Sequence, residues 1–521
     1  MGDASFEQAA GKAALVHQGN YATQAVQHCH IEVPVSYAYM EKGRIVVVSS
    51  TQIPHIVRRV IGQAIGIPWG KIRVIKPYIG GGFGNKQEVL YEPLNAWLTY
   101  MLGGRPVKLE ISREETMLGT RTRHAISFDI TSAVDREGRL LARRVDAISN
   151  QGGYASHGHA IIMNAMNEFK MLYQDEMALE LHARTVYTNI ASGGAMRGYG
   201  IPQAIFALES HMDDLALKLG IDPIEIRTKN HMQLGFVDKT TGITCHSTGL
   251  AECIQKGREY IHWDEKRKAY QNQTGSVRRG VGMAIFCYKT GVYPISLETA
   301  SCRIVLNQDG SVQVQLGATE IGQGGDTVFT QMAAQTLGLH PENVHIVSSQ
   351  DTDVTPFDTG AYASRQTYVT GKAIRQTAEV FKQKVLDYAA GMLKCDPLDL
   401  DLVDNKILGK DGKEAIALED VAMEAFYSLD KQTHITAETT FHCKDNTFSF
   451  GVGFAEIEVD IPLGKITVLD IINVHDSGVL INPQLAQAQV HGGMSMGLGY
   501  ALAEQMLFDD KARLLNDNLL D

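Results

Sequence analysis

Two stretches of the chain, far apart in sequence, follow the same pattern of residues. Each runs from an apolar strand through a Thr and a long polar side chain into an amphipathic helix, then through a Gly and a Pro-bearing turn into a second strand. Internal similarity of this kind predicts two related structural halves. If the halves pack against each other, the two polar strand-to-helix junctions line one site. The stretches are Arg44–Ile75 and Val312–Val347, and the matched pairs are Thr51 with Thr319, Gln52 with Glu320, and Gly66 with Gly338.

The residues around both stretches predict a mixed α and β fold, with strands in hairpins as well as crossovers. Ser50 or Thr51 is expected to cap the helix that follows Ile45–Ser49. A sequence Asn307-Gln308-Asp309-Gly310 predicts a hairpin between Cys302–Leu306 and Val312–Leu316. Further strands are expected at Ile72–Ile75, Pro106–Ile111 and within Ala125–Ser149, and helices at about Glu88–Leu102, Pro202–Leu219, Asp326–Leu337 and Val369–Leu393.

The predicted organisation is two related halves, each with mixed sheets and packed helices. The first is expected over residues 1–235 and the second over 255–521. The turn-rich sequence between them, 236–254, is interpreted as a linker. A length of 521 residues is enough for two to four domains with cores of their own.

Composition and charge exclude several classes of function. The net charge of −11 argues against a general nucleic-acid-binding surface. No stretch is long and apolar enough to predict a membrane span, and the N-terminus lacks the pattern of a secretory signal, so a cytoplasmic protein is expected. The seven cysteines include no CxxC pair, which argues against an iron–sulfur or structural zinc site within this chain.

Two glycine-rich loops are candidates for binding an anionic ligand. The loop Gly80–Gly84 lacks the spacing of a phosphate-binding loop or a dinucleotide fingerprint, and it reads equally well as a structural turn or as a close backbone approach to a bulky ligand. The loop Gly322–Gly325 precedes a helix, whose free N–H groups favour anions such as a pyrophosphate, although a simple glycine-rich cap is the alternative.

Other polar clusters are less specific. Arg197 lies between glycines in a loop before a long helix, which favours a ligand contact over a solvated arginine. Histidines at 28, 30, 157 and 159 are not completed by further metal ligands and are interpreted as core or surface residues. The sequence Asp351-Thr352-Asp353 lacks the rest of a calcium loop.

Taken together, these segments resemble the molybdenum-binding subunit of the xanthine dehydrogenase type, in the molybdenum hydroxylase family. The resemblance covers nearly the whole chain and several ordered motifs, which makes it specific. The motifs are Ser50-Thr51-Gln52, Gly80–Gly84, Ala195–Gly200, Asp222–Arg227 with Lys229-Asn230, Thr319–Gly324, Tyr362-Ala363-Ser364, Asn482-Pro483 and Gln489–Gly492.

The resemblance implies a molybdenum–molybdopterin cofactor, in its plain or cytosine dinucleotide form. The positions expected around the metal are Gln52, Phe83, Arg197 and Ala363. Those expected to hold the pterin and its pyrophosphate are Gly82, Gly322, Gln323, Ser364, Gln366 and Gln489.

Its implied activity is hydroxylation of an electron-poor carbon with oxygen derived from water. Electrons are expected to leave through 2Fe-2S and FAD centres on partner subunits, in a heterotrimer whose further dimerisation stays open. The electron acceptor also stays open. No Gly-Glu pair matches the family's general base, which is expected to lie beyond Asp521, and the small N-terminal domain is largely absent. The chain is thus expected to be a fragment or one product of a split gene.

The implied substrate is a purine or a related N-heterocycle. Positions expected to face it are Gln87, Asn164 and Tyr199. Amides at Gln87 and Asn164 replace the charged residues of purine-oxidising relatives, so an aldehyde remains an alternative. A catalytically incomplete cofactor-binding or assembly piece is the alternative of a different class.

Overall fold

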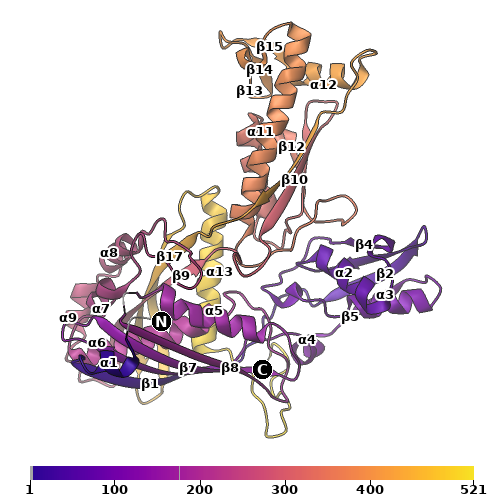
Figure 1. Ribbon diagram of the computed structural model, residues 1–521. Helices are drawn as coiled ribbons and strands as arrows, with labels where there is room; N and C mark the ends of the chain where they lie inside the picture. The colour runs from indigo at the N-terminus through magenta and orange to yellow at the C-terminus, as the bar shows by residue number, and fades with distance from the viewer. Residues whose placement is uncertain (1–3, 175, 521) are drawn as a thin grey trace.

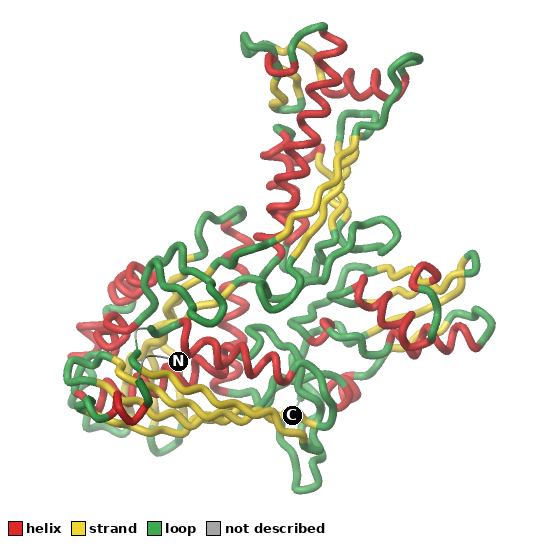
Figure 2. Tube along the Cα trace, viewed as in Figure 1, coloured by secondary structure: helices red, strands yellow, loops and turns green. Residues whose placement is uncertain are grey.

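The computed structural model describes residues 4–174 and 176–520. The chain forms a body, a lobe beside it and an arm that projects away from it (Figure 1). Strands and helices alternate through all three parts, as the colouring by secondary structure shows (Figure 2). The expected mixed fold is confirmed.

The lobe contains the first stretch of the repeat and the arm contains the second, and they share one topology. In the lobe the sheet order is β4-β3-β2-β5, and in the arm it is β12-β11-β10-β16. In each sheet the first pair is parallel and the other two pairs are antiparallel. The duplication read from the sequence is therefore a duplication of structure. The lobe elements are β2 (Val35–Glu41), β3 (Arg44–Ser49), α2 (Pro54–Ile65), β4 (Ile72–Ile75), α3 (Glu92–Met101) and β5 (Val107–Glu110).

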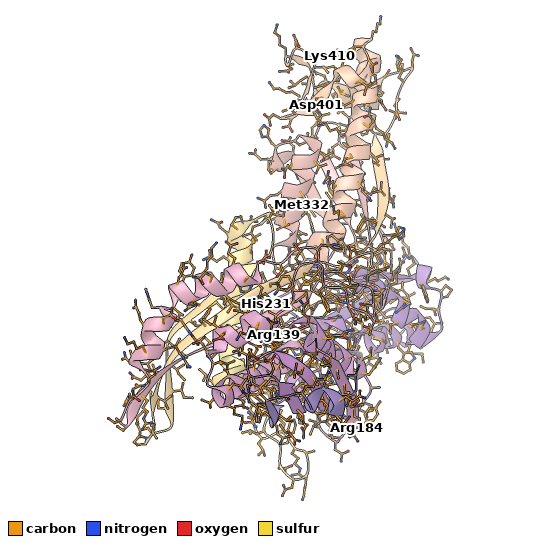
Figure 3. All side chains as sticks on the ribbon, turned by 60° about the vertical axis from the view of Figure 1, so that its left-hand side comes forward. Arg139, Arg184, His231, Met332, Asp401 and Lys410 are labelled. Atoms are coloured by element: carbon orange, nitrogen blue, oxygen red, sulfur yellow. The ribbon has the colours of Figure 1, made fainter. Side chains whose placement is uncertain are left out.

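The arm is longer than the lobe, and one helix runs along its whole length. Helix α11 (Gln366–Leu393) packs along the sheet, and a small sheet β13-β14-β15 closes the tip. Asp401 and Lys410 lie at this tip, and Met332 lies nearer the body (Figure 3). The other arm elements are β10 (Thr299–Leu306), β11 (Val312–Leu316), α10 (Gly325–Leu337), β12 (Val344–Val347), β13 (Asp401–Val403), β14 (Lys406–Leu408), β15 (Glu414–Ala417), α12 (Leu418–Tyr427) and β16 (Thr436–His442).

The body is built from both halves of the sequence around one hydrophobic core. The sheets β1-β6-β7-β8 and β18-β17-β9 enclose helices α5 and α6, and the core runs from Ile126 to Phe454. The body elements are α1 (Phe6–Ala10), β1 (Leu15–Thr23), β6 (Ile126–Val134), β7 (Leu140–Gly152), α5 (Gly158–Met171), β8 (Ala178–Tyr187), α6 (Ile201–Leu219), α7 (Pro223–Asn230), α8 (Leu250–Tyr260), α9 (Trp263–Ala269), β9 (Val277–Lys289), β17 (Phe448–Asp460) and β18 (Lys465–Asp476). Helices α4 (Arg113–Gly119) and α13 (Pro483–Leu502) complete the described chain.

Two local expectations differ from the structure. Helix α2 begins at Pro54 and its N-cap is Ile53, so the predicted cap at Ser50 or Thr51 is wrong; the Thr51 hydroxyl instead accepts the N–H of Ile53 at 3.1 Å. The segment 236–254 contains the start of α8, whose Leu250 and Ile254 belong to the core. Helix α8 therefore begins inside the segment expected to be a linker, because its apolar side chains pack in the core, and the limits of the two halves stay predictions.

Within the described residues, no helix is long and apolar enough to cross a membrane.

Candidate functional site

The side chain of Gln52 lies at the first polar junction and is almost fully buried, with 2% of its surface exposed. Its Nε2 donates to the Ala361 carbonyl at 2.8 Å, and its Oε1 accepts the N–H of Gly84 at 3.0 Å. Both ends of the amide are thus held, one by each half of the chain. An amide is suited to this position because it carries a donor and an acceptor together.

The glycine-rich loop presses its backbone against Gln52. A Cβ at Gly82 would lie 2.5 Å from Gln52 Oε1, so any larger residue there would force the Gln52 amide to move. Gly84 has φ +111, and a Cβ on it would lie 2.5 Å from the Ala195 carbonyl. Phe83, also at positive φ, leaves its ring 39% exposed. The glycines of this loop therefore make room for Gln52 and for the Ala195 carbonyl of the chain itself, and a close approach of the loop to a ligand stays a prediction.

The Arg197 loop lies directly on the glycine-rich loop. The N–H of Arg197 donates to the Phe83 carbonyl at 2.8 Å, and its guanidinium donates to the Gln489 carbonyl of α13 at 2.7 Å. Among the described residues no acidic side chain pairs with the guanidinium, and burial lowers its pKa. A desolvated cation without a counter-ion favours an anionic ligand.

The turn before α11 carries Ala363 and Ser364, both at positive φ. The next residue, Arg365, is fully buried and holds this turn by ion pairs to Glu298 and, at 2.6 Å, to Asp358. Ser364 is exposed and Ala363 half-buried. Arg365, which no sequence motif singled out, therefore holds the strained turn in place.

The second polar junction differs from expectation in one respect. The Glu320 carboxylate accepts the N–H groups of Gly322, Gly324 and Asp326 at 2.7, 3.2 and 3.0 Å. A carboxylate of the chain itself therefore accepts the helix N-terminal N–H groups that were expected to bind a pyrophosphate, and the role of Gly322 in cofactor binding stays a prediction. The pattern Thr-Glu before a glycine-rich helix start is a signal in the sequence that predicts this contact.

Side-chain amides lie beside this junction. Gln323 Oε1 accepts the N–H of Ile321 at 2.7 Å, and its Nε2 lies 3.1 Å from the amide of Gln366. The hydroxyl of Thr319 is buried and has no hydrogen-bond partner in the part of the chain that the structure describes. This group of two glutamines and one unpartnered hydroxyl can bind a ligand rich in hydrogen-bonding edges.

The residues expected to face a substrate are partly grouped. Asn164 Nδ2 donates to the Tyr199 carbonyl at 2.9 Å, and the Tyr199 hydroxyl lies 2.7 Å from His157 Nδ1. Gln87 is half-buried in the turn that follows the glycine-rich loop. The structure therefore joins Asn164 to the Arg197 loop and leaves Gln87 on the glycine-rich loop.

A buried lysine that sequence reasoning missed joins the two junctions. Lys76 follows β4, and its Nζ donates to the Glu320 carbonyl at 2.9 Å. Burial lowers its pKa. Asp351 and Asp353, which do not complete a calcium loop, form ion pairs with Arg73 and Arg44 of the lobe at 2.5 Å each. These contacts fasten the arm to the lobe at the junctions.

Two of the histidines near the site, His28 and His30, are buried. His28 is buried with its Nε2 2.7 Å from the Ala195 carbonyl, and burial lowers its pKa to about 3. In the same way burial lowers the pKa of His30 to about 4. Within 4–174 and 176–520 no group of three or more His, Cys, Asp or Glu side chains is placed to hold a metal ion.

The chain matches a family of molybdopterin cofactor-binding domains twice, over residues 1–231 and 256–521. It belongs to this family, and the predicted resemblance to a xanthine dehydrogenase-type molybdenum-binding subunit, an enzyme of the molybdenum hydroxylase class, is confirmed.

Among curated proteins, the chain is 50% identical to a putative xanthine dehydrogenase molybdenum-binding subunit of Escherichia coli strain K12, over 97% of this chain and 67% of the relative. It is 30% identical to the carbon monoxide dehydrogenase large chain of Hydrogenophaga pseudoflava, over 92% of this chain and 62% of that protein.

Solved structures show the same fold. Quinoline 2-oxidoreductase from Pseudomonas putida 86 superposes with a TM-score of 0.92 at 25% identity, covering 100% of this chain and 69% of that one. The aldehyde oxidoreductase of Desulfovibrio gigas superposes with a TM-score of 0.82 at 27% identity, covering 97% and 53%.

Proposed function

We propose that the chain binds a molybdenum–molybdopterin cofactor at the meeting point of body, lobe and arm, and that the complete enzyme hydroxylates a purine or a related N-heterocycle. The observation that carries the proposal is a continuous set of contacts. Gln489 meets Arg197, Arg197 meets the Phe83 loop, that loop meets Gln52, and Gln52 meets the segment that leads to Ala363.

The residues present fit such a cofactor. Its pterin has many hydrogen-bonding edges, and the Gln323–Gln366 pair beside the unpartnered Thr319 hydroxyl offers matching partners. Its anionic oxygens need a cation, which Arg197 supplies without an acidic neighbour. The cofactor, when bound, supplies the oxidation–reduction chemistry.

In this proposal each residue has a stated task. Gln52, Phe83, Arg197 and Ala363 surround the metal end. Gly82 leaves room for the Gln52 amide, and Gln323, Ser364, Gln366 and Gln489 orient the pterin. Gly322 no longer offers a free amide, because its N–H is held by Glu320. Pyrophosphate contacts are therefore assigned to the side chains of Gln323, Ser364 and Gln366.

The substrate is proposed to lie against Tyr199 and Asn164, with Gln87 at the edge of the glycine-rich loop. Tyr199 offers a ring for stacking on a planar heterocycle. Neutral amides at Asn164 and Gln87 favour a neutral heterocycle over an anionic one, because they lack the charge that would pair with it. The expected domain limits, 1–235 and 255–521, stay predictions, since the core of the body draws residues from both.

Partner subunits carrying 2Fe-2S and FAD are proposed as the route for electrons, in a cytoplasmic heterotrimer. The chain's seven cysteines are all unpaired thiols, five of them buried, which favours a reducing compartment. The cytosine dinucleotide form of the cofactor is included as an alternative to the plain form.

The test is metal and pterin analysis of the protein purified together with its genomic neighbours, followed by a screen of purines, nicotinate and aldehydes. We expect about one molybdenum and one pterin per chain and turnover of a neutral N-heterocycle. Absence of both from the intact complex would contradict the cofactor assignment, and turnover of aldehydes alone would contradict the substrate assignment.

A further inference from the structure

Helix α5 presents one face to the loop that carries Tyr199. His157 is the N-cap of this helix, and Ile161 and Asn164 follow one and two turns later, so the three residues lie along the same face. The ring of His157 meets the ring of Tyr199 edge to face, with 5.8 Å between the ring centroids. A Cβ on Gly200 would lie 2.5 Å from the Ile161 carbonyl, so the loop lies directly on the helix.

This face holds Tyr199 in a conformation that a tyrosine rarely adopts. Tyr199 has φ +48, in the left-handed region, and such a residue persists only where its surroundings fix it. Its N–H donates to the Met196 carbonyl at 2.7 Å, and its carbonyl accepts the Asn164 amide at 2.9 Å. Its hydroxyl lies 2.7 Å from His157 Nδ1. The ring is therefore fixed at its tip as well as at its backbone.

The carboxylate of Glu88 sets the direction of the bond between Tyr199 and His157. Glu88 Oε1 lies 3.9 Å from His157 Nε2, and Glu88 Oε2 accepts Arg121 Nε at 2.6 Å. Burial lowers the pKa of His157, so its ring is neutral at neutral pH and carries one proton. The carboxylate favours that proton on Nε2, which makes Nδ1 the acceptor for the Tyr199 hydroxyl.

The start of α5 also contacts the turn that carries Gln87. Glu88 follows Gln87 in the chain, and its Oε1 accepts the hydroxyl of Ser156, the residue before His157. Two positions proposed to face the substrate, Gln87 and Tyr199, are therefore joined to two adjacent residues at the start of one helix. This joins the glycine-rich loop to the Tyr199 loop on the substrate side.

We propose that His157 is a positioning residue for the substrate, which fixes the plane of the Tyr199 ring so that a planar heterocycle stacks on it. A ring that is already fixed loses little freedom when the ligand binds, so the anchor strengthens binding without touching the ligand. The inference rests on the proposed function in one respect, which is the placing of a planar heterocycle against Tyr199. It does not depend on the form of the cofactor.

Variants of His157 separate its hydrogen bond from its bulk. His157→Leu removes the acceptor, whereas His157→Asn puts an amide oxygen near the position of Nδ1. Neither change removes a helix cap, because the His157 side chain makes no capping bond to α5. Tyr199→Phe keeps the ring and removes the same bond from the other side. His340→Leu, at an exposed histidine of the arm, is the matched control.

The probe is hypoxanthine, a planar neutral purine, added to the complex purified with its genomic neighbours. We expect His157→Leu and Tyr199→Phe to weaken its binding in titration calorimetry about fivefold, which corresponds to ordering one side chain on binding. The KM for hypoxanthine is expected to rise with it, and kcat to change less. The double variant is expected to bind as each single variant does, because both changes remove one bond. His157→Asn and His340→Leu are expected to bind as the wild type does.

Four results would overturn the proposal: no binding of hypoxanthine by the wild type, equal binding by His157→Leu and the wild type, no recovery in His157→Asn, or additive losses in the double variant. Molybdenum content is measured on the same samples and is expected to be equal in all of them. A complex without molybdenum that still shows this order of affinities would contradict the proposed function and support the role of His157. Turnover of hypoxanthine with equal KM in His157→Leu and the wild type would support the proposed function and contradict that role.

Discussion

Gln52 and Ala361 are separated by 309 positions in the sequence and are joined by two hydrogen bonds. The amide of Gln52 donates to the Ala361 carbonyl at 2.8 Å, and the backbone N–H of Ala361 donates to the Gln52 carbonyl at 3.1 Å. The residues leading to Ala363 are thereby placed beside the glycine-rich loop. Gln52 thus joins loops of two different halves through both its side chain and its backbone.

Gln52→Glu tests this connection. The glutamate keeps an acceptor for the N–H of Gly84 but loses the donor for the Ala361 carbonyl, and it buries a charge. We expect the free energy of unfolding to fall by about 1–3 kcal/mol. Molybdenum retention is expected to fall as well, because the loops separate.

Urea unfolding and metal analysis of the purified complex are the measurements. Gln308→Glu, at an exposed turn position, is the control for an added charge. Equal loss of stability in both variants would show that charge, and not the bond to Ala361, is responsible.

Gly82→Ala tests the close approach of the glycine-rich loop. The new Cβ would lie 2.5 Å from Gln52 Oε1, so the amide must move and its two bonds must weaken. We expect a several-fold loss of bound cofactor with the overall fold retained. Gly70→Ala, where a Cβ meets nothing within 4 Å, is the control.

Fluorescence of the released pterin measures the loss. The double variant Gly82→Ala/Gln52→Ala is expected to be no worse than Gln52→Ala alone, since the side chain that clashes is gone. Additive losses would place the effect of Gly82 elsewhere than at Gln52.

The repeat made much of the fold predictable from sequence. The strands and helices of both stretches are predicted by local patterns of residues. Because the two patterns match, the two stretches are expected to share one topology. The roles of Gln52 and Glu320 were harder to predict. Both occupy the same place in the repeat and both accept glycine N–H groups, but Gln52 also reaches the other half. This difference depends on how the arm packs on the lobe, which a local sequence pattern does not specify.

Residues fixed by tertiary packing were not predictable. Arg365 carries no local motif, and its importance follows from the burial of Glu298 and Asp358 around it. Likewise the start of α8 inside the expected linker depends on a core drawn from both halves. Glu298 lies 67 positions from Arg365 in the sequence, and Asp358, although 7 positions away, follows no periodicity that would pair it with Arg365.

Arg365→Met removes the cation from two buried carboxylates. We expect destabilisation of about 3–5 kcal/mol, because an uncompensated buried charge costs more than the pair gains. The triple variant Arg365→Met/Glu298→Gln/Asp358→Asn is expected to recover part of this loss, since no charge then remains buried. Thermal unfolding of the three proteins gives the comparison. No recovery in the triple variant would show that Arg365 acts by its size or by its bond to the Thr299 carbonyl.

Glu168 on α5 is 3% exposed, and burial raises the pKa of its carboxyl from 4.5 to about 7. Its Oε1 accepts the N–H of Cys287 at 3.3 Å and lies 3.1 Å from the Cys287 thiol. The raised pKa means that the folded state binds more protons than the unfolded state between pH 4.5 and 7. Stability therefore falls as pH rises through this window and changes no further on this account above it.

The expected loss is roughly 3 kcal/mol across the window, from about 1.4 kcal/mol for each unit of pKa. Glu168→Gln keeps the shape and the acceptor but cannot ionise, so its advantage over the wild type should grow from pH 4.5 to 7 and then level off. Urea unfolding at half-unit pH steps measures the difference, with exposed Glu342→Gln as the control whose curve runs parallel to the wild type. A constant difference between Glu168→Gln and the wild type across this range would mean that the carboxyl ionises as readily in the folded chain as in the unfolded one, and that water reaches it in the core.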